Sequence, residues 1–362
     1  MSDAPFTWRS ESDSPAPETL LPVDDSLKAD DALRLVRKGS FLLYQGDFHN
    51  ARQLLGAMGR RLAKPRHGGT PLQAFRAERH ARAIEHETLG RVVVELDGAY
   101  KLQLKRAPDV AMACKQAWGE AKDARIVVPL KTLLGLLGAA EWRRKGLEVP
   151  GLPKKLTPHY GVYLPTRTDY VEVFARLGDV KGKKCFDIGT GTGVLALQLL
   201  QKGAASVVGT DIDPRAVACA KENAKFFKVS DRFTVEEREL FPEGRADLVV
   251  CNPPWVPEPP KNRLDRAVFD EGSQMLKSFV AGLNEHLSPG GRGALLLSNL
   301  AELLGLREPG WLDEEFARGG LKVMSRFEIA AKHGKAKDTE DPLHAVRSKE
   351  VTTLYVLTAL PT

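Results

Sequence analysis

Phe186-Asp187-Ile188-Gly189-Thr190-Gly191-Thr192-Gly193 joins a short apolar strand to a helix through a glycine-rich turn. Apolar β-formers precede the turn, and residues 194–202 carry helix formers with apolar spacing. Glycines at alternate positions let the backbone adopt positive φ and let a ligand approach where a Cβ atom would collide. The stretch therefore predicts a strand, a tight turn and a helix with a ligand at the turn.

The spacing of these glycines separates two kinds of ligand. A dinucleotide fingerprint, GxGxxG, would need a glycine where this chain has Val194. The turn instead reads DxGxGxG, and the charge of Asp187 would repel a pyrophosphate. A carboxylate at that place suits a cationic ligand, such as a sulfonium that also carries an amino group.

A second strand ends in another acidic residue. Residues 206–211 are short and apolar and end at Asp211. In doubly wound folds an acid at this place accepts hydrogen bonds from ribose hydroxyls, which is the role we expect for Asp211. Asp213 and Pro214 then have the pattern of a helix N-cap followed by the first helical position.

A third strand, residues 245–251, leads into Asn252-Pro253-Pro254-Trp255. Open α/β sheets bind ligands at this carboxyl end of their strands. The side-chain oxygen of Asn252 and the carbonyl of Pro253 can accept the two protons of a planar NH2 group, whose delocalised lone pair makes it a poor nucleophile. Trp255 offers a flat face for stacking the plane of the substrate. We therefore expect Asn252, Pro253, Pro254 and Trp255 to form the catalytic loop, which acts mainly by orientation.

These motifs resemble those of the class I methyltransferases, which use S-adenosylmethionine and release S-adenosylhomocysteine. The resemblance covers about residues 155–362 and implies a doubly wound, Rossmann-like α/β sheet of seven strands. Residues 252–255 resemble the (N/D)PP(Y/F/W) motif of amino-methylating members, which include nucleic-acid N-methyltransferases and release-factor glutamine methyltransferases. Residues 158–170 resemble, more loosely, the Pro-Arg-x-x-Thr-Glu region of the release-factor enzymes.

The motifs and the resemblance together predict a cofactor site. Glu239 and Leu240 lie where the family usually has an acid near adenine, although a plain surface carboxylate is an equal alternative for Glu239. The predicted cofactor-binding residues are Asp187, Gly189, Thr190, Gly191, Gly193, Asp211, Ile212, Glu239, Leu240, Asn252, Tyr163 and Arg167.

The remaining elements follow the same architecture. We expect a helix over residues 278–287, a fifth strand over 293–298, and a final antiparallel pair of strands over 321–330 and 352–360. Residues 258–272 follow the catalytic loop and could cap the substrate pocket, and 332–350 read as a long loop.

Composition sets limits on the rest of the 362 residues. We expect a disordered lead over 1–26, a basic α+β accessory domain over 27–150 and the catalytic domain over 151–362. The accessory domain is expected to contain helices over 31–61, 73–87 and 133–145 and a hairpin over 91–105. The four cysteines have neither CxxC nor metal-ligand spacing, which predicts no metal and a reducing cytoplasm. We found neither a signal-peptide pattern nor an apolar run of membrane-spanning length, so no membrane partner is expected.

Charge points to the class of substrate. Lys and Arg outnumber Asp and Glu by 22 to 12 in residues 31–150, but number 29 and 28 in residues 151–362. A basic appended domain favours a polyanion, most simply RNA, although a solvated face without a ligand is the alternative. The densest basic cluster comprises Arg52, Arg60, Arg61, Lys64 and Arg66. The expected function is N-methylation of a base in RNA; a protein glutamine or a small amine remains an open alternative.

Overall fold

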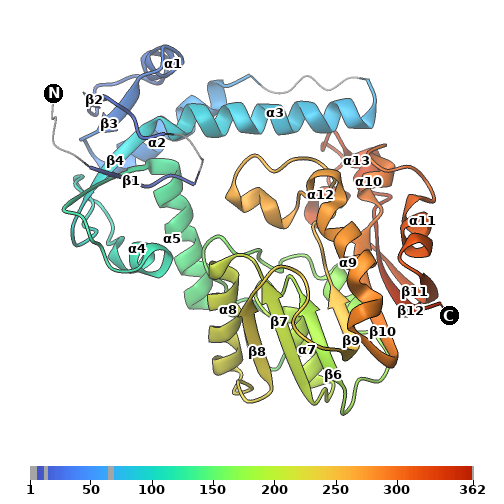
Figure 1. Ribbon diagram of the computed structural model, residues 1–362. Helices are drawn as coiled ribbons and strands as arrows, with labels where there is room; N and C mark the ends of the chain where they lie inside the picture. Colours follow the sequence, from blue (N-terminus) through green and yellow to red (C-terminus); the bar gives the residue numbers. More distant parts are fainter. Residues whose placement is uncertain (1–5, 12–14, 64–68, 361–362) are drawn as a thin grey trace. The chain divides into compact units, whose positions relative to one another are not determined.

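The computed structural model describes residues 6–11, 15–63 and 69–360 (Figure 1). The chain divides into two compact units, one of residues 1–68 and 76–141 and the other of residues 69–75 and 142–362. The boundary near residue 141 differs from the expected 150 because Val149 packs in the core of the second unit.

The second unit is built on a seven-stranded sheet with the order β11-β12-β10-β9-β6-β7-β8. The strand β12 pairs antiparallel with both of its neighbours, and the other pairings are parallel. The strands are β6 (Lys184–Ile188), β7 (Ser206–Asp211), β8 (Phe233–Glu237), β9 (Ala246–Cys251), β10 (Leu287–Ser298), β11 (Leu321–Ala330) and β12 (Val351–Ala359). The expected doubly wound α/β sheet with an antiparallel final pair is confirmed.

Alternating side chains along the central strands build two apolar cores, one on each face of the sheet. Leu248 and Val250 of β9 join one core, whereas Val249 and Cys251 join the other. This period of two is what a strand buried on both faces requires. The sheet is therefore the middle layer of three.

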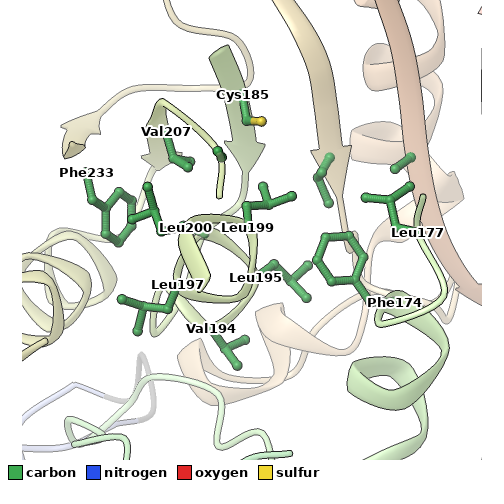
Figure 2. Packing of buried hydrophobic residues seen from close by; sticks show 14 of the residues in the cluster. Phe174, Leu177, Cys185, Val194, Leu195, Leu197, Leu199, Leu200, Val207 and Phe233 are labelled. Carbon is green, nitrogen blue, oxygen red and sulfur yellow. The ribbon is translucent and has the colours of Figure 1, made fainter. Parts of the chain in front are cut away.

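Helices cover both faces. One core includes α6 (Asp169–Phe174), α7 (Val194–Gln201) and α8 (Pro214–Phe226), and the other includes α9 (Gln274–His286) and α11 (Trp311–Arg318). Figure 2 shows α7 with leucines such as Leu195, Leu199 and Leu200 directed into the first core beside Phe174 and Phe233. Because α7 is buried on nearly all sides, the glycine turn that precedes it starts from a fixed support.

Strand register brings the sequence motifs to one edge of the sheet. Ile188, the last residue of β6, pairs with Thr210 of β7 on one side and with Cys251 of β9 on the other. Neighbouring strands lie about 4.8 Å apart. The glycine turn after β6, Asp211 at the end of β7 and Asn252 after β9 therefore meet at the carboxyl edge of the sheet.

The two expected loops contain short helices. Residues 258–272 hold η1 (Arg263–Ala267) and the start of η2 (Glu271–Ser273), and residues 332–350 hold α12 (Gly334–Lys337) and α13 (His344–Arg347). The helix α10 (Leu300–Leu303) follows β10.

The first unit has a five-stranded sheet with the order β1-β5-β4-β3-β2. Its strands are β1 (Thr7–Trp8), β2 (Leu20–Val23), β3 (Phe41–Tyr44), β4 (Val92–Asp97) and β5 (Arg125–Pro129), and the helices in this part of the chain are α1 (Ala29–Arg37), α2 (Phe48–Arg61), α3 (Pro71–Gly90), α4 (Ala111–Trp118) and α5 (Leu130–Lys145). The start of α3, up to Phe75, belongs to the second unit.

Two expectations about this region are wrong, and a third is confirmed only in part. Residues 1–26 were expected to be disordered, but their described part contains β1 and β2, which pair with β5 and β3 through backbone hydrogen bonds. Residues 31–61 form two helices rather than one, because the apolar segment Phe41–Tyr44 between them is a buried strand. The expected hairpin is present only as a short antiparallel contact: Leu96 and Leu102 form a bridge, and the amides of Asp97 and Gln103 donate to the carbonyls of Lys101 and Glu95. The main partners of β4 are β3 and β5.

None of the helices in the described ranges is both long and apolar enough to cross a membrane.

Candidate functional site

The glycine turn is anchored by the buried carboxylate of Asp187. Its Oδ2 atom accepts hydrogen bonds from Thr190 Oγ1 at 2.7 Å and from the amide of Ala196 at 3.2 Å. The side chain is buried, and burial raises the pKa of Asp187 to about 6, although the two hydrogen bonds act in the opposite direction. The hydrogen bonds of Asp187 thus hold the turn in shape. With a pKa of about 6, its carboxylate becomes protonated in mildly acidic solution.

All three glycines of the turn have positive φ, and Gly191 and Gly193 differ in what surrounds them. Gly193, at φ +80°, packs so closely on Phe233 that a Cβ atom would lie 2.9 Å from the phenyl ring. Gly191, at φ +54°, faces open space, because a Cβ atom there would meet no described atom within 4 Å. Gly193 therefore allows close packing on Phe233, and Gly191 leaves a space open above the turn.

Asp211 borders that space. Its Oδ2 atom accepts a hydrogen bond from the amide of Gly191 at 3.0 Å, and its Oδ1 atom accepts one from the amide of Asp213 at 2.9 Å. Burial raises the pKa of Asp211 above its ordinary value. The next side chain, Ile212, is 63% exposed, so an apolar surface lies uncovered beside the carboxylate. The predicted N-cap is confirmed, since Asp213 accepts a hydrogen bond from the amide of Arg215 at the start of α8.

Glu239 and Leu240 follow β8 along the same edge. The amide of the preceding residue, Arg238, donates to the carbonyl of Asp211 at 3.0 Å, and Thr210 Oγ1 donates to the carbonyl of Leu240. Glu239 itself is exposed. These contacts bring the two residues next to Asp211, while a role for Glu239 at the adenine remains a prediction.

The Asn252-Pro253-Pro254-Trp255 loop leaves the end of β9 next to the glycine turn. The indole Nε1 of Trp255 donates a hydrogen bond to Asn252 Oδ1 at 2.9 Å. A carboxamide oxygen has two lone pairs, so one acceptor position of Asn252 is still open to another donor. Beyond the loop, Val256 and Phe269 form a backbone bridge that closes residues 257–268 into a loop.

Arg167 lies against the catalytic loop. Its guanidinium carbon is 4.7 Å from the centroid of the Trp255 ring, and its nitrogens bond to Asp169 at 2.5 and 3.1 Å and to Glu350 at 2.9 Å. One face of the indole is thus occupied, which leaves at most the other face for the substrate plane. Tyr163 is 38% exposed. Partial burial is the main cause that raises the pKa of its phenol, and the charge of Arg167 opposes the rise.

Sequence analysis missed several residues that support the site. Asn223 of α8 is fully buried, and its Nδ2 donates to the carbonyls of Thr157 and Thr192, which ties the glycine turn to the segment before α6. Met275 of α9 reaches Gly189, where a Cβ atom would lie 2.7 Å from its methyl group. An asparagine in an otherwise amphipathic helix was the available signal for Asn223, but its partners are distant in sequence.

A further apolar cluster supports the far end of the catalytic loop. It packs Val256 against Phe75 and Leu343, and the rings of Phe75 and Phe269 lie 6.4 Å apart. Residues from the start of α3 therefore contribute to the second unit beside this loop.

Comparison with known proteins identifies the family of this chain. Residues 171–253 match a family described as ribosomal protein L11 methyltransferase (PrmA). A protein of Methanocaldococcus jannaschii, described as "Putative protein N5-glutamine methyltransferase", is 36% identical over 162 residues, which are 42% of this chain and 80% of that protein. This chain belongs to the class I S-adenosylmethionine-dependent methyltransferases.

Other relatives are similar to this methyltransferase over shorter stretches of sequence. The tRNA1(Val) (adenine(37)-N6)-methyltransferase of Porphyromonas gingivalis is 36% identical over 124 residues, 31% of this chain and 48% of its own length. The chain thus spans only about half of that relative. The crystal structure of a ribosomal protein L11 methylase from Lactobacillus delbrueckii subsp. bulgaricus matches 54% of this chain and 78% of its own, with 18% identity and a TM-score of 0.37.

The carboxyl edge fits the cofactor of this class, S-adenosylmethionine. The space above Gly191 would be filled by a Cβ atom, and the carboxylate of Asp211 and the exposed Ile212 lie next to it. We propose that the glycine turn holds the methionine part, Asp211 the ribose hydroxyls and Ile212 the adenine face.

Proposed function

We propose that this methyltransferase transfers a methyl group to a planar nitrogen of a macromolecule, with Asn252 and Pro253 orienting the accepting NH2 group. The observation that carries the proposal is the register of Ile188 with Cys251, after which the glycine turn and Asn252 begin side by side. A cofactor at the turn and an amino group at Asn252 are thereby neighbours.

The residues of the loop act on the substrate by orientation. The open acceptor position of Asn252 and the carbonyl of Pro253 accept the two N–H bonds, which turns the nitrogen lone pair out of conjugation and towards the cofactor. Proline at 253 and 254 fixes φ, so these acceptors are held in place before the substrate binds. Bound S-adenosylmethionine supplies an electrophilic methyl group. The nitrogen becomes acidic as it is alkylated, so the loop itself needs no strong base.

We propose RNA as the substrate, because basic charge is concentrated in residues 31–150. Arg52 and Arg60 are exposed on α2, whereas Arg61 pairs with Asp30 at 2.8 Å. Lys64 and Arg66 of the predicted cluster lie outside the described residues. The tRNA adenine methyltransferase among the relatives supports the same substrate class.

A protein glutamine is the second candidate, and a specific observation favours it. The Methanocaldococcus jannaschii relative, of which this chain covers 80%, is described as a "Putative protein N5-glutamine methyltransferase". A glutamine amide and an adenine amino group both have a delocalised lone pair and two N–H bonds, so the same loop would serve either.

Transfer of a labelled methyl group separates the two candidates. The protein is incubated with tritiated S-adenosylmethionine and either deproteinised RNA or an RNA-free protein extract. We expect the RNA to become labelled, and ribonuclease should release that label. In a separate binding measurement, the double variant Arg52→Gln/Arg60→Gln should flatten the salt dependence of RNA affinity by about one unit of log–log slope per lost phosphate contact. Label only in protease-sensitive material would reject RNA and support glutamine.

A further inference from the structure

A chain of contacts runs from two buried carboxylates to Asn252. Asp169 and Glu350 hold the guanidinium of Arg167, Arg167 covers one face of Trp255, and Trp255 donates to Asn252 Oδ1. These residues come from three separate segments of the second unit, and the proposed chemistry does not require Arg167 to touch the substrate.

The first part of the chain is rigid. Arg167 makes four hydrogen bonds, to Asp169, Glu350 and Thr352, and a guanidinium has five N–H groups in a planar fork. The carboxylate of Asp169 also accepts from Thr352 Oγ1 at 2.5 Å, and that of Glu350 from Ser298 Oγ at 2.7 Å. The side chains of both acids are about 1% exposed. The guanidinium plane is therefore fixed from two sides.

The surroundings of Asp169 and Glu350 stabilise the ionised form of both carboxylates. Burial alone would raise the pKa of Asp169 and of Glu350, but hydrogen bonds and the charge of Arg167 hold both pKa values below the ordinary range. His333 contributes from the loop before β12, since its Nε2 lies 2.9 Å from Glu350 Oε2 while its Nδ1 accepts from the amide of Ala336. That amide contact assigns the ring proton of a neutral His333 to Nε2, where it donates to Glu350.

The second part of the chain decides how the Asn252 carboxamide is turned. An indole nitrogen can only donate, so the atom of Asn252 that faces it must be the oxygen. Rotating the amide by half a turn would set two donors against each other. The indole N–H of Trp255 therefore holds Oδ1 in place, with one lone pair free for the substrate.

We propose that Arg167 is a positioning residue: it holds the Trp255 indole, and through the indole N–H it fixes the acceptor orientation of Asn252. The proposal rests on the function proposed above for Asn252. It assigns Arg167 to the catalytic loop, in place of the direct cofactor contact that the sequence predicts.

The test compares Arg167→Lys, Trp255→Phe and the double variant. Arg167→Lys keeps the charge between the two buried carboxylates but loses the planar fork and its stacking on the ring. Trp255→Phe keeps an aromatic ring and loses the N–H donor. Arg176→Gln is the matched control, because Arg176 donates to the carbonyl of Glu328 and takes no part in the chain of contacts.

We expect each single variant to lower kcat for methyl transfer by about 10²-fold, the loss that misplacement of a reacting group by about 1 Å can cause. KM and the affinity for S-adenosylhomocysteine should change by less than about threefold. The double variant should be no slower than Trp255→Phe, because Arg167 acts only through the indole. Arg167→Lys with wild-type kcat, or losses that multiply in the double variant, would overturn the proposal.

A spectroscopic readout keeps this test independent of the substrate. The chain has 5 tryptophans, and the indole Nε1–H resonance of Trp255 can be assigned by its loss in Trp255→Phe. Arg167→Lys should move that resonance and leave the other indole signals in place, and Arg176→Gln should move none of them. An unmoved Trp255 resonance would overturn the positioning role. If the resonance moves but the wild type methylates neither RNA nor protein, the proposed function fails and the contact with Arg167 stands.

Discussion

Alanine at three glycines of the second unit should separate backbone strain, packing and ligand space. Gly182, Gly191 and Gly193 all have φ between +54° and +80°, a region that an L-residue occupies at a cost of about 1–2 kcal/mol. A Cβ atom at Gly182 or Gly191 meets no described atom within 4 Å. Each of these two substitutions should therefore lower the free energy of unfolding by about 1–2 kcal/mol.

Gly193→Ala should cost more, because its Cβ atom would lie 2.9 and 3.2 Å from two ring carbons of Phe233. Figure 2 shows Phe233 in the apolar core beside α7, and its side chain is only 3% exposed. Overpacking of a core costs a further 1–3 kcal/mol, so the total loss should be about 2–5 kcal/mol. Phe233→Leu should recover part of that loss in the Gly193→Ala background.

Urea unfolding and calorimetric titration with S-adenosylhomocysteine measure the two effects. Gly191→Ala should be as stable as Gly182→Ala but should bind S-adenosylhomocysteine at least about tenfold more weakly. Gly182→Ala should bind it with the affinity of the wild type. Gly193→Ala as stable as Gly182→Ala would refute the packing argument. Unchanged affinity in Gly191→Ala would show that the open space above the turn is not the place of the cofactor.

Two further predictions concern the acids at this edge. Because the pKa of Asp187 is about 6 and its ionised form favours a cationic ligand, the Kd of the sulfonium S-adenosylmethionine should fall as pH rises through about 6 and level off above about 7. A Kd that titration calorimetry finds constant from about pH 5 to 8 would count against this. Asp213→Ala should cost about 1 kcal/mol of stability in urea without changing affinity, since it removes a helix cap and a partly exposed ion pair with Arg215. Asp211→Ala should instead weaken binding, and equal effects of the two on affinity would contradict their assigned roles.

The sequence predicts the catalytic sheet well because its signals are local. The glycine turn, Asp213 with Pro214, and the apolar run before Asn252 each lie within a few residues of the element they define. Tandem strands ending in acids or amides then set the order of the elements along the chain, and a doubly wound fold has few alternatives.

The first unit was harder to predict because its strands are short. The apolar segment Phe41–Tyr44 has four residues, and a run of that length does not distinguish a strand from part of a helix. The strands β1 and β2 lie in a polar, proline-containing segment, and their pairing partners supply the order that their own sequence does not.

Long-range contacts explain what was missed in the site. The ion pair of Arg167 with Glu350 spans 183 positions of sequence, and nothing near either residue indicates the pair. The place of Arg167 near the cofactor stays a prediction. The partners of Asn223 are likewise 31 and 66 positions away. Such contacts depend on which strand ends meet at one edge, and this emerges only when the sheet is assembled.

The position of the transferred methyl group tests the central claim most directly. The protein is supplied with S-adenosylmethionine carrying a deuterated methyl group and with its RNA or protein substrate, and the product is digested and fragmented by mass spectrometry, with Asn252→Ala in parallel. The account predicts label on an exocyclic amino or amide nitrogen, reduced about 10²-fold in Asn252→Ala while the affinity for S-adenosylhomocysteine is kept. Label on carbon, oxygen or sulfur, or equal labelling by Asn252→Ala, would contradict it.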